Sequence, residues 1–270
     1  MTGPRDWPLR GALFVLAAGV ILSAGAPVIA GDPFSQQLDT ILLPPGTAGH
    51  PLGTDHLGRD VLSRLLHGAR SSYMVAVGSA VISGVLGTAV GTLAGLIRSR
   101  WMDRLLQVAM DGLLAFPTVL LAVTVTMVFG PGRLQVMWTL GIVYTPVVYR
   151  VARLETRRTV VQDYYQVSQA LGTRPVSRGM LHLLPNVVPQ VLVQLASLAA
   201  LAIGTEAALS FLGLGTQPPE PSWGIMLNDA RRYMTQAPYL SVFPGLAAGL
   251  LAFALQFSSD RLAVRLQHEG

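Results

Sequence analysis

The sequence predicts an all-α, polytopic membrane protein with six transmembrane helices. Three observations support this fold class. Of the 270 residues, 51% are hydrophobic and only 12% are charged, whereas a soluble protein carries about 25% charged residues. The mean hydropathy is positive, at +0.50. The apolar residues also gather into long runs that are separated by arginine-rich polar segments, which is typical of a chain that crosses a membrane repeatedly.

The composition excludes several classes of function. The chain has no cysteine, so disulfides, thiolate metal sites and cysteine nucleophiles are ruled out. It also has no lysine and therefore no P-loop of its own, because that loop needs its lysine. No GxSxG or HExxH motif is present, and no catalytic residue is predicted. The net charge of +5 comes from arginines spread between apolar runs, which fits membrane topology better than nucleic-acid binding.

Residues 1–72 are expected to form an N-terminal transmembrane helix and an outer amphipathic segment. The apolar run 11–30 can cross a ~30 Å hydrocarbon core, although a signal peptide cleaved near residues 24–26 is a competing interpretation. Apolar residues at helical spacing in 61–69 predict an amphipathic helix that leads into the next span. Four charged residues can pair along its other side: Asp55, Arg59, Asp60 and Arg64. His50 and His56 share this segment, but two histidines alone predict no metal site.

Residues 73–270 should hold the other five spans. Small residues recur every four positions in the first of these, which provides a face for the close approach of another helix. The second of these spans contains Pro117, and the third is interrupted by Pro146. The predicted spans are 73–97, 105–129, 135–148, 187–212 and 239–257.

Two acidic residues fall inside these spans, Asp111 and Glu206. An acid within a membrane is costly unless it faces protein or water. Each is a candidate for the transport pathway. A structural role, in which neighbouring residues satisfy the carboxylate, is the favoured interpretation for both.

Residues 149–186 are the longest polar stretch between apolar runs without clustered proline and glycine. Val160, Tyr164, Val167 and Leu171 fall at helical spacing, and Gly172 occupies the expected left-handed cap position. A second short helix could run over 175–184, ahead of Pro185. The stretch is either a basic loop that fixes topology or a docking surface for a soluble partner.

The segment 213–238 is long for a simple connection, which suggests a function. Its prolines exclude a regular helix before Trp223. A short helix is expected over 223–234.

The arginine distribution predicts the orientation. If the N-terminus is cytoplasmic, thirteen of the nineteen arginines lie in inner segments and six in outer segments. By the positive-inside rule, both termini should be cytoplasmic. The assignment would invert if residues 1–30 were cleaved.

Several motifs resemble the permease subunits of ABC importers, in the dipeptide, oligopeptide and nickel branch. The family's cytoplasmic loop motif is matched by Asp163-Tyr164, Ala170-Leu171-Gly172 and Leu184-Pro185-Asn186. Here the family's alanine pair is replaced by Val167-Ser168, and its preceding acidic residue by Gln166. Further similar blocks lie, in family order, at 53–70, 110–117 and 206–215. The resemblance covers roughly residues 50–257.

The resemblance implies a type I ABC importer transmembrane domain in a bacterial inner membrane. The expected partners are a homologous second permease subunit, an extracytoplasmic substrate-binding protein, membrane lipid, and two ATP-binding subunits or one fused ATPase. ATP and Mg would bind to the ATPases, and no cofactor to this chain. The coupling helices would lie at about 157–185, and the ATPase-coupling residues implied are Asp163, Tyr164, Ala170, Leu171, Gly172, Leu184 and Pro185. The outer gate and binding-protein contact would include Trp223, Asn228 and Arg231.

The cargo expected from the resemblance is a di- or oligopeptide. Nickel or a metal chelate is the alternative, since the two histidines of the outer segment and the run 223–231 resemble those of nickel-type members. A secondary transporter is a remote alternative, because no internal repeat is evident.

Overall fold

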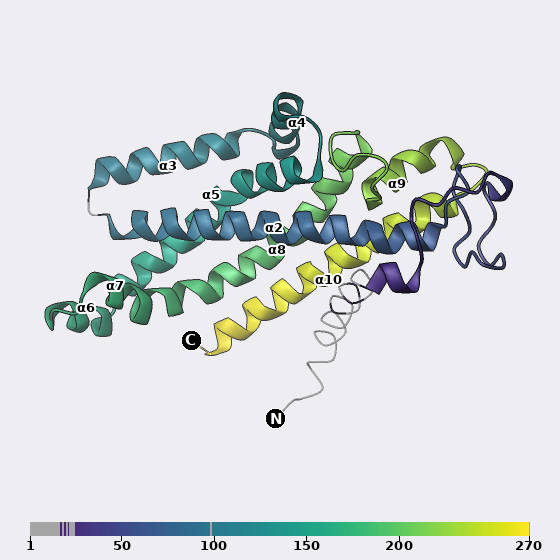
Figure 1. The fold of residues 1–270 in the computed structure, drawn as a ribbon. Helices are drawn as coiled ribbons and strands as arrows, with labels where there is room; N and C mark the ends of the chain where they lie inside the picture. The colour runs from purple at the N-terminus through teal and green to yellow at the C-terminus, as the bar shows by residue number, and fades with distance from the viewer. Residues whose placement is uncertain (1–16, 18, 20, 22–24, 98, 270) are drawn as a thin grey trace.

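The computed structural model describes residues 17, 19, 21, 25–97 and 99–269. Within this part of the chain all the regular secondary structure is helical, apart from two isolated β-bridges near the N-terminal side of α2 (Figure 1). The long helices run side by side, with α6 and α7 at one end of the bundle and α9 at the other. The helices are η1 (Leu38–Thr40), α2 (Val61–Leu96), α3 (Arg100–Ala115), α4 (Thr118–Phe129), α5 (Arg133–Val160), α6 (Asp163–Ala170), α7 (Pro175–Arg178), η2 (Gly179–Leu183), α8 (Leu184–Phe211), α9 (Trp223–Ala230), η3 (Arg231–Tyr233) and α10 (Tyr239–Glu269).

Helix α2 is a single helix of 36 residues. It starts at Asp60, whose carboxylate accepts a hydrogen bond from the Ser63 amide at 2.7 Å and so caps the first turn. The sequence predicted an amphipathic helix near 61–69 that leads into a span at 73–97. In the structure the two segments form one continuous helix.

The small residues of α2 let α5 approach closely, as the four-residue spacing predicted. A Cβ atom placed on Gly91 would lie 2.5 Å from the Tyr149 carbonyl oxygen and 2.9 Å from the Ala152 Cβ. Gly87 faces the α5 backbone in the same way. Because a side chain would fill this space, the glycines set how near the two helices can lie.

The predicted third span, 105–129, is broken at Pro117. Helix α3 ends at Ala115, α4 begins at Thr118, and the two axes are bent by 86°. Phe116 is extended, at φ −84° and ψ 132°, since a residue before proline is disfavoured in the helical region. The predicted span therefore consists of two helices, with the break at the proline that it contains.

The predicted fourth span, 135–148, is only the first part of α5, which continues to Val160. Pro146 lies inside this helix without ending it. The apolar residues Val136, Leu140 and Val143 are buried, so the helix forms part of the core with α2 and α8.

The short helix predicted over 175–184 does not end before Pro185. Residues 175–211 form one helical run of 37 residues. It contains a π turn, in which the Leu184 amide donates to the Gly179 carbonyl. A π turn can stand where Pro185, which has no amide hydrogen, interrupts the regular hydrogen bonds.

Three helices of the described residues are long and apolar enough to cross a membrane: Val61–Leu96, Pro175–Phe211 and Tyr239–Leu266. The bent pair α3 and α4 would make a fourth if it counts as one span. Most of the predicted first span, 11–30, lies outside the described residues, and α5 does not belong to this group.

Candidate functional site

Two polar regions lie at opposite ends of the bundle (Figure 1). We call the first the α6 end, residues 155–190, and the second the α9 end, residues 31–72 and 213–238. Both contain residues that the sequence singled out.

At the α6 end, Gly172 terminates α6 in a left-handed conformation, with φ +74°. The Gly172 amide donates a hydrogen bond to the Gln169 carbonyl at 3.1 Å, and the Thr173 amide donates one to the Ser168 carbonyl at 3.2 Å. This pair of hydrogen bonds is the Schellman motif, which satisfies carbonyls that the helix end leaves free. The predicted glycine cap is confirmed.

One side of α6 packs against the following helices. Tyr165 and Ser168 are buried, and the Arg178 guanidinium lies 5.4 Å from the centre of the Tyr165 ring. On the neighbouring turn, the Asn186 side-chain amide donates to the Tyr164 hydroxyl at 3.1 Å and to the His182 carbonyl at 2.6 Å. These contacts hold α6 onto the segment that leads into α8.

The apolar face predicted for this stretch points outward instead of into the bundle. Leu171 is 80% exposed, and Val167 and Tyr164 are also exposed. The exposed apolar residues continue on the next segment at Val176, Met180 and Leu181. An exposed apolar patch with a polar rim is typical of a protein-protein contact.

The other coupling candidates gather in the same region. Asp163 is exposed in the first turn of α6, where a carboxylate is favoured by the helix dipole. Ala170 is the last residue of α6 and is exposed. Leu184 is half-buried at the start of α8, and Pro185 beside it is exposed.

Ion pairs connect α3 to α5 near this end. Asp103 accepts two hydrogen bonds from Arg153, at 2.8 and 2.7 Å, and lies 2.9 Å from Arg157. Asp111 pairs with Arg150 at 2.6 Å. Asp111 therefore has an arginine partner in this structure, which is the arrangement expected of a structural acid.

At the α9 end, Trp223 joins α9 to α2. Its indole N–H donates to the Leu65 carbonyl at 3.0 Å, and the residue is 5% exposed. Asn228 is exposed and donates to the Phe211 carbonyl, and Arg231 is exposed at the start of η3. Of these three candidates, Trp223 positions α9, whereas Asn228 and Arg231 lie on the surface.

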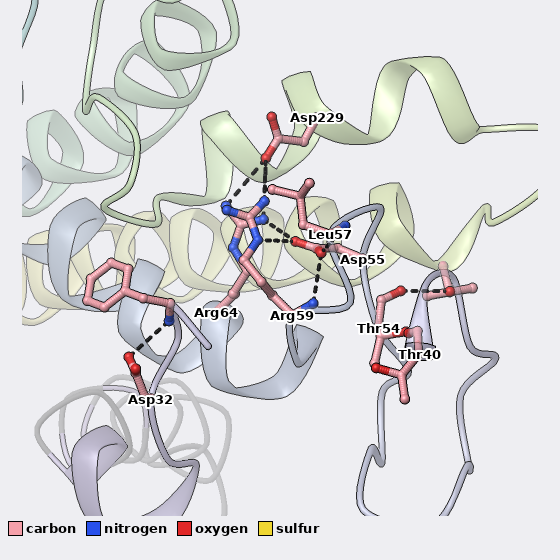
Figure 2. A network of polar contacts seen from close by, with 10 residues as sticks. Asp32, Thr40, Thr54, Asp55, Leu57, Arg59, Arg64 and Asp229 are labelled. Atoms are coloured by element: carbon pink, nitrogen blue, oxygen red, sulfur yellow. Dashed lines mark hydrogen bonds and ion pairs between the residues drawn. The ribbon is translucent and has the colours of Figure 1, made fainter. Parts of the chain in front are cut away.

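Four charged side chains form a cluster that we call the charge clasp: Asp55, Arg59 and Arg64, which are buried, and Asp229, which is half-buried. Figure 2 shows both guanidinium groups between the two carboxylates. The Asp55 carboxylate accepts hydrogen bonds from the guanidinium groups of Arg59, at 2.7 Å, and Arg64, at 2.5 Å. Asp229, on α9, lies 3.3 Å from Arg64 and 3.5 Å from Arg59. The clasp therefore ties α9 to the start of α2 and the segment before it, although Asp229 lies 165 residues after Arg64 in the chain.

Burial alone would raise the pKa of Asp55, but the guanidinium groups of Arg64 and Arg59 outweigh it and hold the pKa below its ordinary value. The amides of Leu57 and Arg59 also donate to Asp55, at 2.8 and 3.0 Å. Asp55 is thus the carboxylate that compensates both buried arginines at neutral pH.

The sequence predicted that Asp55, Arg59, Asp60 and Arg64 could pair with one another, and three of these four do so in the clasp. It placed these charges on a surface, however, and did not include Asp229. Asp60 is not in the clasp, because it caps α2 and contacts the His50 ring at 3.0 Å. No local spacing relates Asp229 to Asp55, so sequence reasoning had no signal for it.

Glu206 lies inside the bundle and is 1% exposed. It accepts hydrogen bonds from Ser210 at 2.7 Å and from Ser72 of α2 at 3.1 Å. Ser210 in turn accepts from the Thr216 amide, and Thr216 bonds to Ser71 at 2.8 Å. This chain of hydrogen bonds connects α8, α2 and the segment 213–222.

The histidines considered for metal binding have other contacts. His50 contacts Asp60, and the His56 ring stacks on Tyr233 with 5.4 Å between ring centres. In the part of the chain that the structure describes, no three histidine or acidic side chains are grouped to hold a metal ion.

Residues 87–268 match the family described as "Binding-protein-dependent transport system inner membrane component". The chain belongs to this family. It is therefore a multi-pass permease component of an ABC transporter in the inner membrane, a class that works with a binding protein and an ATPase.

Several relatives resemble the permease over most of its length. The Di/tripeptide transport system permease protein DppC of Pseudomonas aeruginosa is 39% identical over 260 residues, which cover 94% of this chain and 85% of the relative. The Glutathione transport system permease protein GsiD of Pectobacterium atrosepticum is 37% identical, over 80% of this chain and 71% of the relative. The Dipeptide transport system permease protein DppC of Alkalihalophilus pseudofirmus is 31% identical, over 93% of this chain and 82% of the relative.

Among solved structures, the permease resembles a chain of the MetNI methionine ABC transporter in an inward-facing conformation. The TM-score is 0.59 with 16% sequence identity, over 74% of this chain and 94% of that chain. This similarity supports the all-α fold of an ABC importer transmembrane domain.

Proposed function

We propose that this chain is the transmembrane subunit of an ATP-driven importer for short peptides, which an extracytoplasmic binding protein delivers. The observation that carries the proposal is the extended similarity to permeases named for dipeptides, di- and tripeptides and glutathione, itself a small peptide. A metal or chelate cargo is not proposed, because the relatives that support the proposal are named for peptides and glutathione.

The proposed topology has six spans with both termini in the cytoplasm. The spans are 11–30, α2, the bent pair α3 and α4, the first part of α5, α8 and α10. Residues 1–72 would then supply the first helix and the outer segment, and 73–270 the transmembrane domain. The α6 end would face the cytoplasm, because thirteen of the nineteen arginines then fall in inner segments.

At the α6 end, the ATPase would dock on the exposed apolar face around Leu171. Helix α6 stands between two long core helices, since α5 runs to Val160 and the helical run of α8 begins at Pro175. Only short segments separate α6 from each of them. A displacement of α6 by an ATPase would therefore reach the core directly, which is the requirement for a helix bundle with two states.

At the α9 end, Asn228 and Arg231 would contact the binding protein, and the clasp and Trp223 would hold α9 in place. A homologous second permease subunit would enclose the pathway together with this chain. Two ATPase subunits, or one fused ATPase, would bind ATP and Mg.

The test is transport by the purified complex. The tagged chain is extracted with its neighbours in mild detergent, and the partners are identified and reconstituted in proteoliposomes with the binding protein. We expect ATP-dependent uptake of di- and tripeptides. Recovery of the chain without an ATPase, or a complex that transports no peptide with its own binding protein, would contradict the proposal.

A paired substitution tests the docking face. Leu171→Ser with Val167→Ser should reduce the amount of co-purifying ATPase about tenfold or more, because both side chains are exposed and lose apolar contact area only in the complex. Leu246→Ser with Leu250→Ser, two exposed residues of α10, is the control. Equal ATPase recovery in both variants would rule out this face as the docking surface.

A further inference from the structure

A pocket of about 260 Å³ opens at the α9 end, outside the clasp. It lies where the first turns of α2 meet residues 33–34, the start of α5 and residues 220–221. Its wall combines His67, Arg70 and Met74 of α2 with Phe34, Arg133 and Glu220. The volume is slightly below the roughly 300–1,000 Å³ of sites for drug-sized ligands, so the pocket suits a small molecule or one end of a larger one.

The charges of the pocket do not cancel. Arg133 and Glu220 form an ion pair at 2.6 Å and neutralise each other. Arg70 is exposed, and no acidic side chain of the described residues lies within ion-pair distance of its guanidinium. The pocket therefore has one cation in excess, presented by a group that can bind a carboxylate through two parallel hydrogen bonds.

His67 adds a fixed polar atom. Its Nδ1 lies 2.9 Å from the Ser63 carbonyl oxygen, which can only accept, so Nδ1 carries the proton. In the neutral ring, Nε2 is then an acceptor. A ligand that has an N–H group beside a carboxylate complements both His67 and Arg70.

The rest of the wall is apolar apart from Ser71, whose hydroxyl is hydrogen-bonded to Thr216. Phe34 and Met74 are both partly exposed, and Pro33 and Pro221 complete this side. An inorganic anion would leave these surfaces in contact with water, whereas a carboxylate that carries an apolar body would cover them.

We infer that this pocket binds the C-terminal carboxylate of a short peptide as the peptide passes from the binding protein into the permease. Arg70 holds the carboxylate, His67 accepts from the preceding peptide N–H, and Phe34 and Met74 contact the last side chain. This inference rests on the proposed peptide cargo and adds a recognition site within the permease itself.

The experiment uses the full complex in proteoliposomes with a saturating amount of loaded binding protein. Transport of trialanine is compared with transport of its C-terminal amide, and calorimetry verifies that both load the binding protein. Arg70→Gln should slow transport of the acid about tenfold or more, because a charge-assisted hydrogen-bond pair is lost, and should leave the amide nearly unchanged. Arg70→Lys should retain part of the preference, since it keeps the charge without the paired geometry.

Arg232→Gln is the matched control, because Arg232 is an exposed arginine of the same end that does not line the pocket. It should leave the acid-to-amide ratio unchanged. Arg70→Gln acting equally on acid and amide, with wild-type peptide transport intact, would overturn the carboxylate site and leave the proposed function standing. Absence of any peptide transport by the wild type would instead overturn the proposed function.

A lipid headgroup is the competing anionic ligand. Native mass spectrometry of the complex in phosphatidylglycerol nanodiscs separates the two ligands. Loss of bound phosphatidylglycerol in Arg70→Gln, together with an unchanged acid-to-amide transport ratio, would assign the pocket to lipid and overturn the inference.

Discussion

At the scale of single residues, Gly172 is the position that the sequence predicted best. A glycine between a helical pattern and a proline suggested a left-handed cap, and the structure has φ +74° there. No heavy atom lies within 4 Å of a Cβ placed on Gly172. The glycine is therefore required by its backbone conformation and not by lack of space.

Gly172→Ala should weaken the cap of α6, because the left-handed conformation costs a residue with a Cβ about 1–2 kcal/mol. We expect amide hydrogen exchange of residues 165–171 to rise about tenfold, since 1.4 kcal/mol corresponds to a factor of ten in the opening equilibrium. Gly172→Asn is the control, because asparagine tolerates this conformation. Equal protection in Gly172→Ala and the wild type would contradict the assigned cap.

Asp55 is the residue on which the charge clasp depends, because it contacts both buried arginines. Removing one partner of a buried ion pair typically costs about 3–5 kcal/mol. Asp55→Asn should therefore lower the Tm of the purified permease in detergent by about 6–12 °C. Asp39→Asn, an exposed acid in the same segment, should leave the Tm nearly unchanged.

The pH dependence of this effect follows from the depressed pKa of Asp55. The stability that its ionised form contributes is fully present above its unfolded value of 3.8 and is lost as the pH falls through the lower folded pKa. The Tm difference between wild type and Asp55→Asn should therefore stay constant from pH 7 to pH 5. A difference that shrinks within this range would mean that the folded pKa of Asp55 is raised.

At the scale of helices, one proline breaks a helix and another does not, and the sequence pattern did not distinguish the two cases. Pro117 ends α3, whereas Pro146 lies inside α5. Pro146 is buried where α5 packs on α2 and α8, and these contacts can offset a lost hydrogen bond. No residue of α3 is buried, so the neighbouring structure provides much less to offset the same loss at Pro117.

The contact of α2 with α5 provides a test at this scale. Gly91→Ala would put a methyl group 2.5 Å from the Tyr149 carbonyl oxygen, which forces two backbones apart. We expect a loss of about 1–3 kcal/mol in the free energy of unfolding, measured by denaturant titration in mixed micelles. Gly112→Ala of α3, where no atom lies within 4 Å, should be neutral or slightly stabilising. A neutral Gly91→Ala would disprove the close helix contact.

At the scale of the whole molecule, the orientation in the membrane can be measured directly, because the chain contains no cysteine. Arg174→Cys at the α6 end and Gln236→Cys at the α9 end are both exposed positions. In intact spheroplasts, a membrane-impermeant maleimide should label Gln236→Cys and not Arg174→Cys. After lysis both should be labelled. The reverse pattern in spheroplasts would invert the proposed topology.

The motifs of the sequence indicated the family by resemblance. Its composition and residue spacing determined the all-α membrane class, the glycine cap and the small-residue face of α2. These features depend on local composition and on spacing within one helix, which the sequence displays directly. Only the tertiary structure decided which prolines end a helix, that the apolar face of α6 points outward, and that Asp229 completes the charge clasp with Asp55. Each of these depends on contacts between segments far apart in the chain, for which the spacing of neighbouring residues contains no information.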